Sequence, residues 1–590
     1  MESTKTLQKF FNSMKLRNMK YLKKYKLSFL LTLLVMLTSC GEDFLDVQNL
    51  NDLDITTVYK TEEDLTLALN HLYFSLPRLD LEDDLNSQNS DQAYLVPYFW
   101  TDDAVHRSIS GAGTNGSDFL WGDNTRSLRT FYRYQDIADI NFFLEALPDA
   151  TFTTEENRVR FAAEARFLRA WIYESMVFAY GDVPLLTNTI GPAEQPFRTP
   201  RQEVFNFVIS ELDEIDDILP ERYDETSDAG RITKGAVLAL KSRAYLNAIG
   251  WNSNVSEMYA GAEAACEEII NSNVYSLASG IDGFAEQFTS ASDLTSSETI
   301  LSTIYLIDVH VSRIARQIGL KGAFRGTDGG DTPQRRPGYS SDFIEEVQTI
   351  NGLFPKDDTS YDPANPWENR DPRLAVSVVL PGDTLPAAAG LDVDYIYQPH
   401  VEIAPSTDNF GGVNCPTGYA FRKYLDYSLA TLVEGDTDLK VIRYSEILLM
   451  YAEALAGQGE DGSALGYLNQ VRNRVGMPSY TLATLPIIIR GTTGDGMIDA
   501  ILLERRYEFA GEGPQRWFDI WRYKLGDQVI TSVYALPINE DEPGDLGDKY
   551  PAGGENSTTF TRTWDDRNYL LPIWSTYLDA NTNLTQNPGW

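Results

Sequence analysis

Helical periodicity recurs along most of this chain and determines the expected fold class. After Thr61, an N-cap residue, Glu62 and Glu63 occupy the first turn of a pattern whose apolar residues share one helical face. These patterns come in pairs and carry small residues at close-packing spacing, which favours stacked helix pairs, although no fixed repeat period is visible. The sequence therefore predicts a mainly α fold. The further patterns cover 133–147, 157–179, 201–218, 233–249, 257–272, 441–456, 461–475 and 496–510.

Three long segments, 80–130, 281–437 and 525–565, interrupt the helical patterns. They are rich in Gly, Pro, Asp and aromatic residues, and they contain short strand-like runs such as 375–380. Loops of this length inside a folded protein usually carry function, so we expect a helical scaffold with an irregular, loop-rich lobe that binds the ligand. The predicted parts are a signal segment (1–39), an N-terminal helical region (40–280) with a loop insertion (80–130), the irregular lobe (281–437), and a C-terminal helical region with a docked tail (438–590).

The first 40 residues have the pattern of a bacterial lipoprotein signal. Several lysines and an arginine precede an apolar run at 27–37, which is too short to span a membrane. Leu37, Thr38 and Ser39 then lead into Cys40, as in a lipobox. We expect Cys40 to be acylated and to anchor the mature protein in membrane lipid. The alternative, a buried cysteine at the end of a core helix, is disfavoured by the cations that precede it.

Charge and cysteine content exclude several classes of protein. The formal net charge is −37, and removing the cationic signal makes the mature chain more acidic still. Such a charge repels phosphate backbones and anionic headgroups, so we expect no nucleic-acid partner. Beyond Cys40, only Cys266 and Cys415 remain, too few for a disulfide scaffold, although a bridge between them stays open. Cys266, inside a helical pattern, is interpreted as an apolar filler.

Searches for catalytic and metal-binding patterns give little. The histidines are not spaced as zinc ligands, and no G-x-S-x-G sequence is present. A literal G-x-G-x-x-G at 111–116 follows no strand pattern and is interpreted as a loop. Acidic loops at 80–91 and 539–548 could hold Ca²⁺, but solvated loops are the simpler interpretation. We therefore predict no catalytic residue, no metal site and no cofactor, while a glycosidase carboxylate pair stays open.

Several charged residues lie within apolar helical patterns and are interpreted as structural. We expect interhelical ion pairs from Arg166, Arg169, Glu446, Glu453, Glu504 and Glu508. Arg370 and Arg373 flank Asp371-Pro372 in a turn, where we expect the arginines to hold loop carbonyls. The terminal Trp590 is expected to dock the C-terminal tail through its indole ring.

A series of distinctive sequence blocks lies in order along the mature chain. The blocks are C-G-E-D-F-L-D at 40–46, A-E-A-R-F-L-R-A at 163–170, Y-G-D-V-P-L at 180–185, G-R-I-T-K-G-A at 230–236, N-R-D-P-R-L at 369–374, R-Y-S-E-I-L-L-M-Y-A-E-A at 443–454, L-N-Q-V-R-N-R-V-G-M-P at 468–478, E-R-R-Y-E-F at 504–509, R-W-F-D-I-W-R at 516–522, Y-L-L-P-I at 569–573 and Q-N-P-G-W at 586–590. Each block alone is weak, but the collinear set is specific. Together the blocks resemble the SusD/RagB family of surface nutrient-binding lipoproteins.

The resemblance implies a scaffold of tetratricopeptide-like helix pairs and a non-enzymatic role. It implies an outward-facing lipoprotein of the outer membrane that binds an oligosaccharide and passes it to a SusC-like TonB-dependent transporter. Glu42 and Asp43 resemble a signal for export to the outer face. Two alternatives stay open: the same transport role with a peptide ligand, and a secreted α-helical glycoside hydrolase, which would need two carboxylates about 5–10 Å apart.

Aromatic side chains in the irregular segments are the candidate ligand contacts. Flat rings stack on the apolar faces of sugars, while neighbouring amides and acids bind hydroxyl groups. Most aromatic residues in a folded protein lie in its core, so each assignment competes with a structural role. The family resemblance implies an aromatic platform in these variable regions but carries over no particular residue. The candidates are Tyr98, Trp100, Trp121, Phe324, Tyr339, Trp367 and Tyr397.

Overall fold

The computed structural model describes most of the chain beyond the N-terminal segment. Contacts between residues group Thr61–Trp590 into one compact unit. The predicted signal segment, Cys40, Cys415, Phe324 and the two acidic loops lie wholly or largely outside the described residues. The described residues are 59–78, 94–106, 119, 121–123, 125–223, 228–307, 309–320, 337–386, 394–399, 416–425, 435–537 and 558–590.

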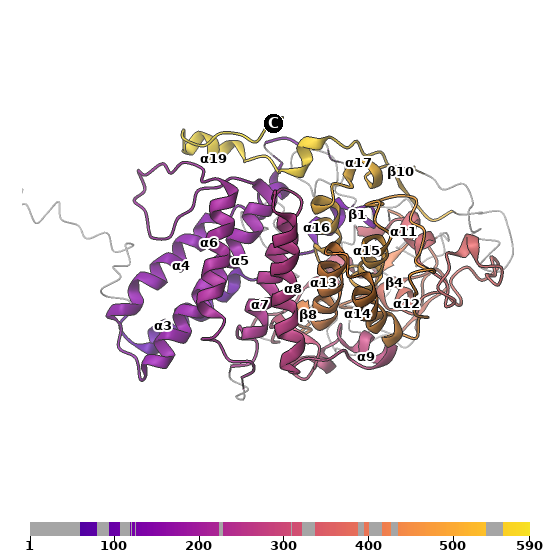
Figure 1. The fold of residues 1–590 in the computed structure, drawn as a ribbon, viewed down its shortest axis with the longest axis horizontal. Helices are drawn as coiled ribbons and strands as arrows, with labels where there is room; N and C mark the ends of the chain where they lie inside the picture. The colour runs from indigo at the N-terminus through magenta and orange to yellow at the C-terminus, as the bar shows by residue number, and fades with distance from the viewer. Residues whose placement is uncertain are drawn as a thin grey trace, which may run out of the picture. The chain divides into compact units, whose positions relative to one another are not determined.

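Helices α3 to α8 form the N-terminal part of the compact unit (Figure 1). Thr61 caps α3 in a capping box with Asp64, as its sequence pattern predicts. Helix α5 packs against α6, and α7 packs against α8, so consecutive helices form pairs. The helices are α3 (Glu62–Leu72), α4 (Tyr134–Ala146), α5 (Glu155–Tyr180), α6 (Arg201–Ile215), α7 (Lys234–Ala248) and α8 (Val255–Ser272).

A second group of helices comes from the C-terminal part of the sequence. Helix α13 packs against both α14 and α8, and thereby joins the C-terminal group to the N-terminal one (Figure 1). Within the described residues, no helix is long and apolar enough to cross a membrane. The helices are α13 (Tyr444–Gly457), α14 (Asp461–Arg474), α15 (Gly496–Glu508), α16 (Gln515–Arg522), α17 (Gly526–Val529) and α19 (Ser575–Ala580).

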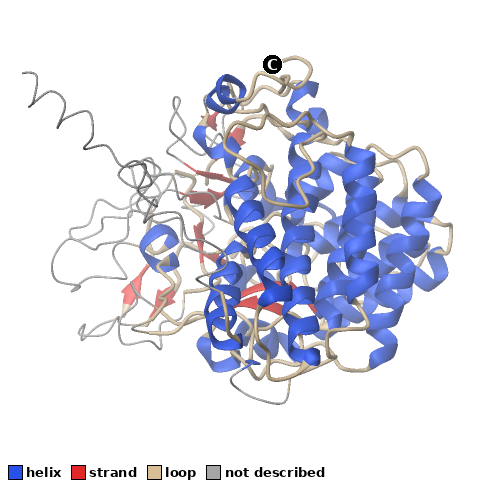
Figure 2. Ribbon diagram, turned by 90° about the vertical axis from the view of Figure 1, so that its left-hand side faces the viewer, coloured by secondary structure: helices blue, strands red, loops and turns tan. Residues whose placement is uncertain are grey.

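Short elements fill the irregular segments, and Figure 2 shows their strands gathered mainly to one side of the helices. Every strand pair in the described part of the chain is antiparallel and two-stranded: β1 (Ala104–His106) with β3 (Pro337–Tyr339), β2 (Thr299–Thr303) with β8 (Leu439–Arg443), β4 (Val378–Val379) with β7 (Ala420–Phe421), β5 (Thr384–Leu385) with β6 (Tyr395–Ile396), and β9 (Val533–Tyr534) with β10 (Thr558–Phe560). The short helices are α9 (Gly280–Glu286), α10 (Ile314–Ile318), α11 (Ser341–Glu346) and α12 (Arg373–Ser377). The 3-10 turns are η2 (Tyr73–Ser75), η3 (Val96–Trp100), η4 (Arg126–Arg129), η5 (Leu147–Asp149), η7 (Ser290–Ser292), η8 (Pro355–Asp357) and η9 (Asp566–Tyr569).

The mainly α prediction is confirmed, with two local corrections. The pattern at 441–456 begins too early, because residues up to Arg443 belong to β8 and the helix starts at Tyr444. The strand-like run at 375–380 contains a strand only at Val378–Val379, since Arg373–Ser377 forms the single turn α12. The first error arises because pairing of β8 with β2, which is distant in sequence, overrides local periodicity. In the second, the chain is helical up to Ser377, and only the two residues that pair with β7 are extended.

The charged residues in the helical patterns form buried ion pairs, as expected. Arg169 binds Glu211 at 2.7 Å, Glu446 binds Arg243 at 2.9 Å, and Glu453 binds Arg522 at 2.6 Å. Arg443, fully buried, contacts Glu298, Glu508 and Glu512. Each buried charge needs its partner, because an unpaired buried charge is strongly destabilising. These ion pairs therefore favour one arrangement of the helices.

Two further predictions are confirmed: Trp590 docks the C-terminal tail, and Cys266 is a buried residue within a helix. The Trp590 indole N–H contacts the carbonyl oxygens of Arg567 and Leu570, at 3.3 and 2.8 Å, and the Arg567 guanidinium lies 4.4 Å from the indole ring. Cys266 is buried and free, and its sulfur lies 2.9 Å from the Ser242 hydroxyl. Burial raises the pKa of the Cys266 thiol to about 12, which makes it unreactive.

Candidate functional site

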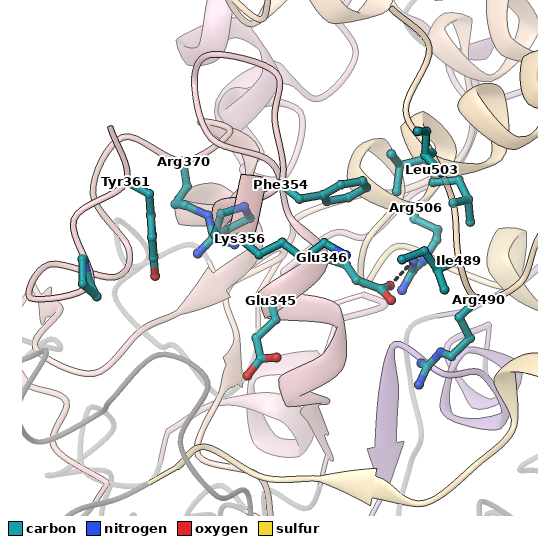
Figure 3. A pocket seen from close by; sticks show the side chains of 14 residues that line it. Glu345, Glu346, Phe354, Lys356, Tyr361, Arg370, Ile489, Arg490, Leu503 and Arg506 are labelled. Carbon is teal, nitrogen blue, oxygen red and sulfur yellow. Dashed lines mark hydrogen bonds and ion pairs between the residues drawn. The ribbon is translucent and has the colours of Figure 1, made fainter. Parts of the chain in front are cut away.

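A cavity of about 580 Å³ opens between α11, the loop that follows it, and the segment that leads into α15 (Figure 3). In Figure 3, Tyr361, Arg370 and Lys356 lie on one side, and Ile489, Arg490, Leu503 and Arg506 lie on the other. A volume of this size accommodates a small oligomer such as a di- or trisaccharide. We define the pocket by its lining residues, Glu345, Glu346, Phe354, Pro355, Lys356, Tyr361, Pro363, Arg370, Ile487, Ile488, Ile489, Arg490, Leu503 and Arg506.

Helix α11 is fixed at both ends, which places Glu345 and Glu346 at the pocket wall. At its start, the Ser340 hydroxyl accepts from the Phe343 N–H at 3.1 Å and donates to the Asp102 carbonyl at 2.7 Å. At its end, the Tyr507 hydroxyl on α15 donates to the Glu346 carbonyl at 2.5 Å. The start of the short helix is therefore tied to the segment before β1 and its end to α15.

The loop that carries Phe354 and Lys356 is closed by Asp358. Its carboxylate accepts from the Thr349 hydroxyl at 2.5 Å, from Asn351 at 3.0 Å and from the Ser360 N–H at 2.9 Å. The hydrogen bond from Thr349, followed by those from Ser360 and Asn351, holds the pKa of Asp358 well below its usual range. The loop is therefore preorganised, with Phe354 half-buried at the pocket.

Arg370 stabilises one side of the pocket by hydrogen bonds to backbone carbonyls. Its guanidinium donates to the carbonyl oxygens of Val347, Pro366 and Ile344, at distances between 2.5 and 3.1 Å. It also lies 5.8 Å from the ring centroid of Tyr361. This confirms the expectation that an arginine of this turn holds loop carbonyls. Arg373 differs, because it binds Asp371 and Glu504, each at 2.7 Å, rather than loop carbonyls.

The opposite side is built from arginines paired with acids. Arg506 binds Asp103 and Glu346, each at 2.6 Å, and Arg490 binds Asp342 at 2.7 Å. Burial opposes the charge on Arg506, but Asp103, Asp102 and Glu346 together raise its pKa well above its usual value. Arg506 therefore stays charged and holds α15, α11 and the segment before β1 together.

The pocket combines apolar surface with hydrogen-bonding groups. Phe354, Pro355, Leu503 and the run 487–489 provide the apolar part, with Ile487 83% and Ile489 76% exposed. Neighbouring isoleucines with such exposure indicate a contact surface for a ligand or partner. The two glutamates follow each other on one helical turn, so their side chains diverge and do not face each other across a substrate. Glu346 is also committed to Arg506.

Most of the aromatic residues nominated from the sequence lie in the core. Tyr339 stacks on Phe421 at 4.2 Å, and Trp100 packs edge-on against Trp517 at 5.7 Å. Burial is nearly complete for Tyr98, Trp100, Trp121, Tyr339 and Tyr397. Trp367 is half-buried and does not line the pocket, and Phe324 lies outside the described residues. The ligand-contact role of these seven residues stays a prediction. Because five of them are buried, we assign the candidate site to the residues that line the pocket.

Sequence reasoning missed the main components of the pocket. Phe354, Lys356 and the isoleucine run were not nominated, although Pro486 followed by three isoleucines is an unusual apolar run inside an expected loop. Such a run is a usable signal, because a loop with no helical or strand pattern has no core face on which to bury it. Among the described residues, no cluster of His, Cys, Asp and Glu has the geometry of a metal site.

Comparison with protein families gives two matches that lie one after the other. The model described as starch-binding, associating with the outer membrane, matches residues 43–246, and the SusD family model matches residues 320–590. A SusD-like protein of Formosa agariphila is 26% identical and covers 96% of this chain and 100% of its own length. The starch-binding protein SusD of Bacteroides thetaiotaomicron is 24% identical over 77% of each chain.

Solved structures share the fold. A SusD-like carbohydrate-binding protein of Bacteroides fragilis superposes with a TM-score of 0.73 at 23% identity, covering 90% of this chain and 100% of its own. Surface glycan-binding protein A of Bacteroides thetaiotaomicron, solved with laminarihexaose, gives a TM-score of 0.63 at 20% identity, covering 90% and 100%. This likeness confirms the expected scaffold of tetratricopeptide-like helix pairs with a loop-rich part containing short strands. The chain belongs to the SusD/RagB family.

Proposed function

We propose that this protein captures an oligosaccharide in the pocket between α11 and α15 and delivers it to a SusC-like TonB-dependent transporter in the outer membrane. The observation that carries the proposal is a preorganised cavity of about 580 Å³ with an aromatic ring and several polar side chains, in a chain of this family. Phe354 offers an apolar face for a sugar ring, and the charged groups around it can bind hydroxyl groups.

The relatives support a glycan rather than another ligand. One is named as a starch-binding protein, and one solved relative holds laminarihexaose. The aromatic and apolar lining of the pocket agrees with this ligand class. Binding without catalysis at this pocket is supported by its glutamates, because they are adjacent in sequence and Glu346 is held by Arg506.

The lipid anchor follows from the lipobox. Cys40 carries the acyl chains, and the mature protein sits on the outer face of the outer membrane. The transporter is the partner to which a surface binding protein of this family would pass its ligand. Ligand would favour a closed state of that assembly only by binding it more tightly than the open state.

Calorimetric titration tests the proposal. The chain from Gly41 onwards is titrated with a panel of polysaccharides, oligosaccharides and peptides, and each mixture is examined by mass spectrometry for cleavage products. We expect saturable binding of a glycan with no released fragment. Binding of peptides alone would replace the ligand class, and a released fragment would show a hydrolase.

A point variant connects the binding to the pocket. Phe354→Ala removes the aromatic face and is expected to weaken glycan binding by about tenfold. Phe197→Ala is the matched control, because Phe197 is 70% exposed and lies outside the pocket lining. Equal affinity in the two variants would place the glycan site elsewhere on the molecule.

Anchoring and delivery are tested in cells. Cys40→Ala should prevent labelling by a fatty acid analogue and release the protein from membranes. Protease added to whole cells should remove the wild-type protein if it faces outward. The transporter should co-purify with the wild-type protein from detergent extracts, and its absence from such extracts would contradict the delivery step.

A further inference from the structure

The lining of the pocket differs in charge composition from the molecule as a whole. The chain has a formal net charge of −37, yet cations outnumber acids in the pocket lining. Charges on the distant surface are largely screened beyond about 8 Å at physiological ionic strength, so the groups in the lining dominate the field that a bound ligand feels. The lining contains Lys356, Arg370, Arg490 and Arg506 as cations and Glu345 and Glu346 as acids.

Two of these four cations are neutralised by neighbouring carboxylates. Arg506 lies between Asp103 and Glu346, and Arg490 binds Asp342 at 2.7 Å. Their charge is used within the protein to hold α15 against α11. They contribute hydrogen-bonding groups to the pocket but little net positive charge.

The remaining two cations form no ion pair within the described residues. Arg370 is 7% exposed, and the hydrogen bonds of its guanidinium go to neutral carbonyls, with no carboxylate at ion-pair distance. Burial lowers the pKa of Arg370, and tyrosines and Glu345 only partly offset that effect. Lys356 is exposed, lies 5.9 Å from the Phe354 ring, and forms no ion pair in the described part of the chain.

An uncompensated cation with neutral hydrogen-bond partners is stabilised when an anion approaches it. In Figure 3, Lys356 and Arg370 lie on the same side of the pocket, with Phe354 between them and Leu503. A ligand with an apolar ring face and an anionic substituent fits this arrangement, because the ring contacts Phe354 while the anion lies near Lys356. A neutral sugar would bring no opposite charge to either cation.

We infer that the ligand is an acidic oligosaccharide whose carboxylate or sulfate group lies beside Lys356 and Arg370. This inference rests on the proposed function and specifies its substrate class. It also predicts that affinity falls as salt concentration rises, since a charged contact at a partly exposed site is screened. A neutral glycan bound through ring stacking and hydroxyl groups would show little dependence on salt.

The test uses matched acidic and neutral glycans with the mature protein. One pair is an oligogalacturonide and its methyl ester, and the other is a carrageenan oligosaccharide and its desulfated form. These pairs distinguish a carboxylate from a sulfate, and a wider panel of acidic and neutral polysaccharides on an array covers other linkages. We expect the acidic members to bind and their neutral counterparts to bind at least about tenfold more weakly.

Charge reversal at Lys356 assigns the effect to the pocket. Lys356→Glu should weaken binding of the acidic glycan by at least about tenfold and reduce its salt dependence. Lys60→Glu is the matched control, since Lys60 is exposed and lies outside the pocket lining. It makes the same change in net charge and should leave affinity within about twofold. Unchanged circular dichroism and melting temperature show that both variants are folded.

The possible failures are distinguishable. Binding of neutral glycans that equals or exceeds binding of acidic ones overturns this inference and leaves the proposed function standing. Equal effects of Lys356→Glu and Lys60→Glu also overturn it. Binding of peptides with no glycan of either kind overturns the proposed function, and the inference falls with it. No binding to any acidic member of the panel likewise counts against the inference.

Discussion

At the residue scale, Asp438 makes the stability of the protein depend on pH. Its carboxylate accepts from the Tyr305 N–H at 2.9 Å, and one of its oxygens is buried without a hydrogen-bond partner in the described residues. Lys440 lies 4.0 Å away but also binds Asp293, and Asp436 lies nearby. Burial, opposed by Lys440 and assisted by Asp293, raises the pKa of Asp438 to about 7.

The stability that Asp438 contributes falls as pH rises, because the folded and unfolded states bind its proton differently. Between about pH 4 and pH 7 the folded protein keeps the Asp438 proton that the unfolded chain releases, so the contribution to stability falls as pH rises. Asp438→Asn removes this titration. Urea unfolding at several pH values should show the variant becoming more stable relative to wild type as pH increases over that range. A difference that is constant with pH would contradict the raised pKa.

The role of a residue was predictable where it depends on neighbours in the sequence. It was not predictable where it depends on packing between distant segments. The carbonyl contacts of Arg370 and the ion pairs of Glu446 and Glu453 follow from residue type and neighbours. The burial of Trp100 does not, because its edge-on contact with Trp517 joins segments more than 400 residues apart. Exposure is a property of that long-range packing, which no local pattern encodes.

At the element scale, the N-cap of α5 makes a measurable contribution to stability. The Thr154 hydroxyl accepts from the Asn157 N–H at 3.2 Å and satisfies one free donor of the first turn. Thr154→Ala should reduce the free energy of unfolding by about 1 kcal/mol, whereas Thr154→Ser, which keeps the hydroxyl, should retain most of it. Chemical unfolding measures both variants. Equal losses in the two would show that the cap contributes nothing.

Helix positions were predicted within a few residues, and the exceptions have a physical cause. The pattern at 461–475 corresponds to Asp461–Arg474, because caps and periodicity are local signals. The pattern at 441–456 overlapped β8, which pairs with Thr299–Thr303 from another part of the chain. The pocket itself was not predicted, since it forms where the loop after α11 meets the segment before α15.

At the scale of the whole molecule, the C-terminal tail fastens the end of the sequence to its N-terminal half. The Asn587 amide donates to the carbonyls of Tyr180 and Leu571 at 3.0 and 2.7 Å, and it accepts from Arg198 at 2.5 Å. Asn587→Ala should reduce the free energy of unfolding by about 1–3 kcal/mol, because the buried carbonyls of Tyr180 and Leu571 each lose a donor and the Arg198 guanidinium loses one of its acceptors. Thermal unfolding should show a lower melting temperature, and hydrogen exchange should increase near Tyr180.

Asn583→Ala is the control for that prediction. Asn583 also contacts the N-terminal half, through the Gln195 carbonyl at 2.6 Å, but it lies in a more exposed position. Exposed hydrogen bonds are readily replaced by water, so this change should cost much less. A similar loss in both variants would contradict the view that the buried Asn587 is the main fastening point.

The proposed function requires an oligosaccharide in the pocket between α11 and α15. A crystal structure of the mature protein with the glycan that calorimetry identifies would show where the glycan lies. We expect an intact sugar with one ring against Phe354 and with polar contacts to the cations of the pocket. A glycan bound on another surface, or one cleaved in the crystal, would contradict the proposed function.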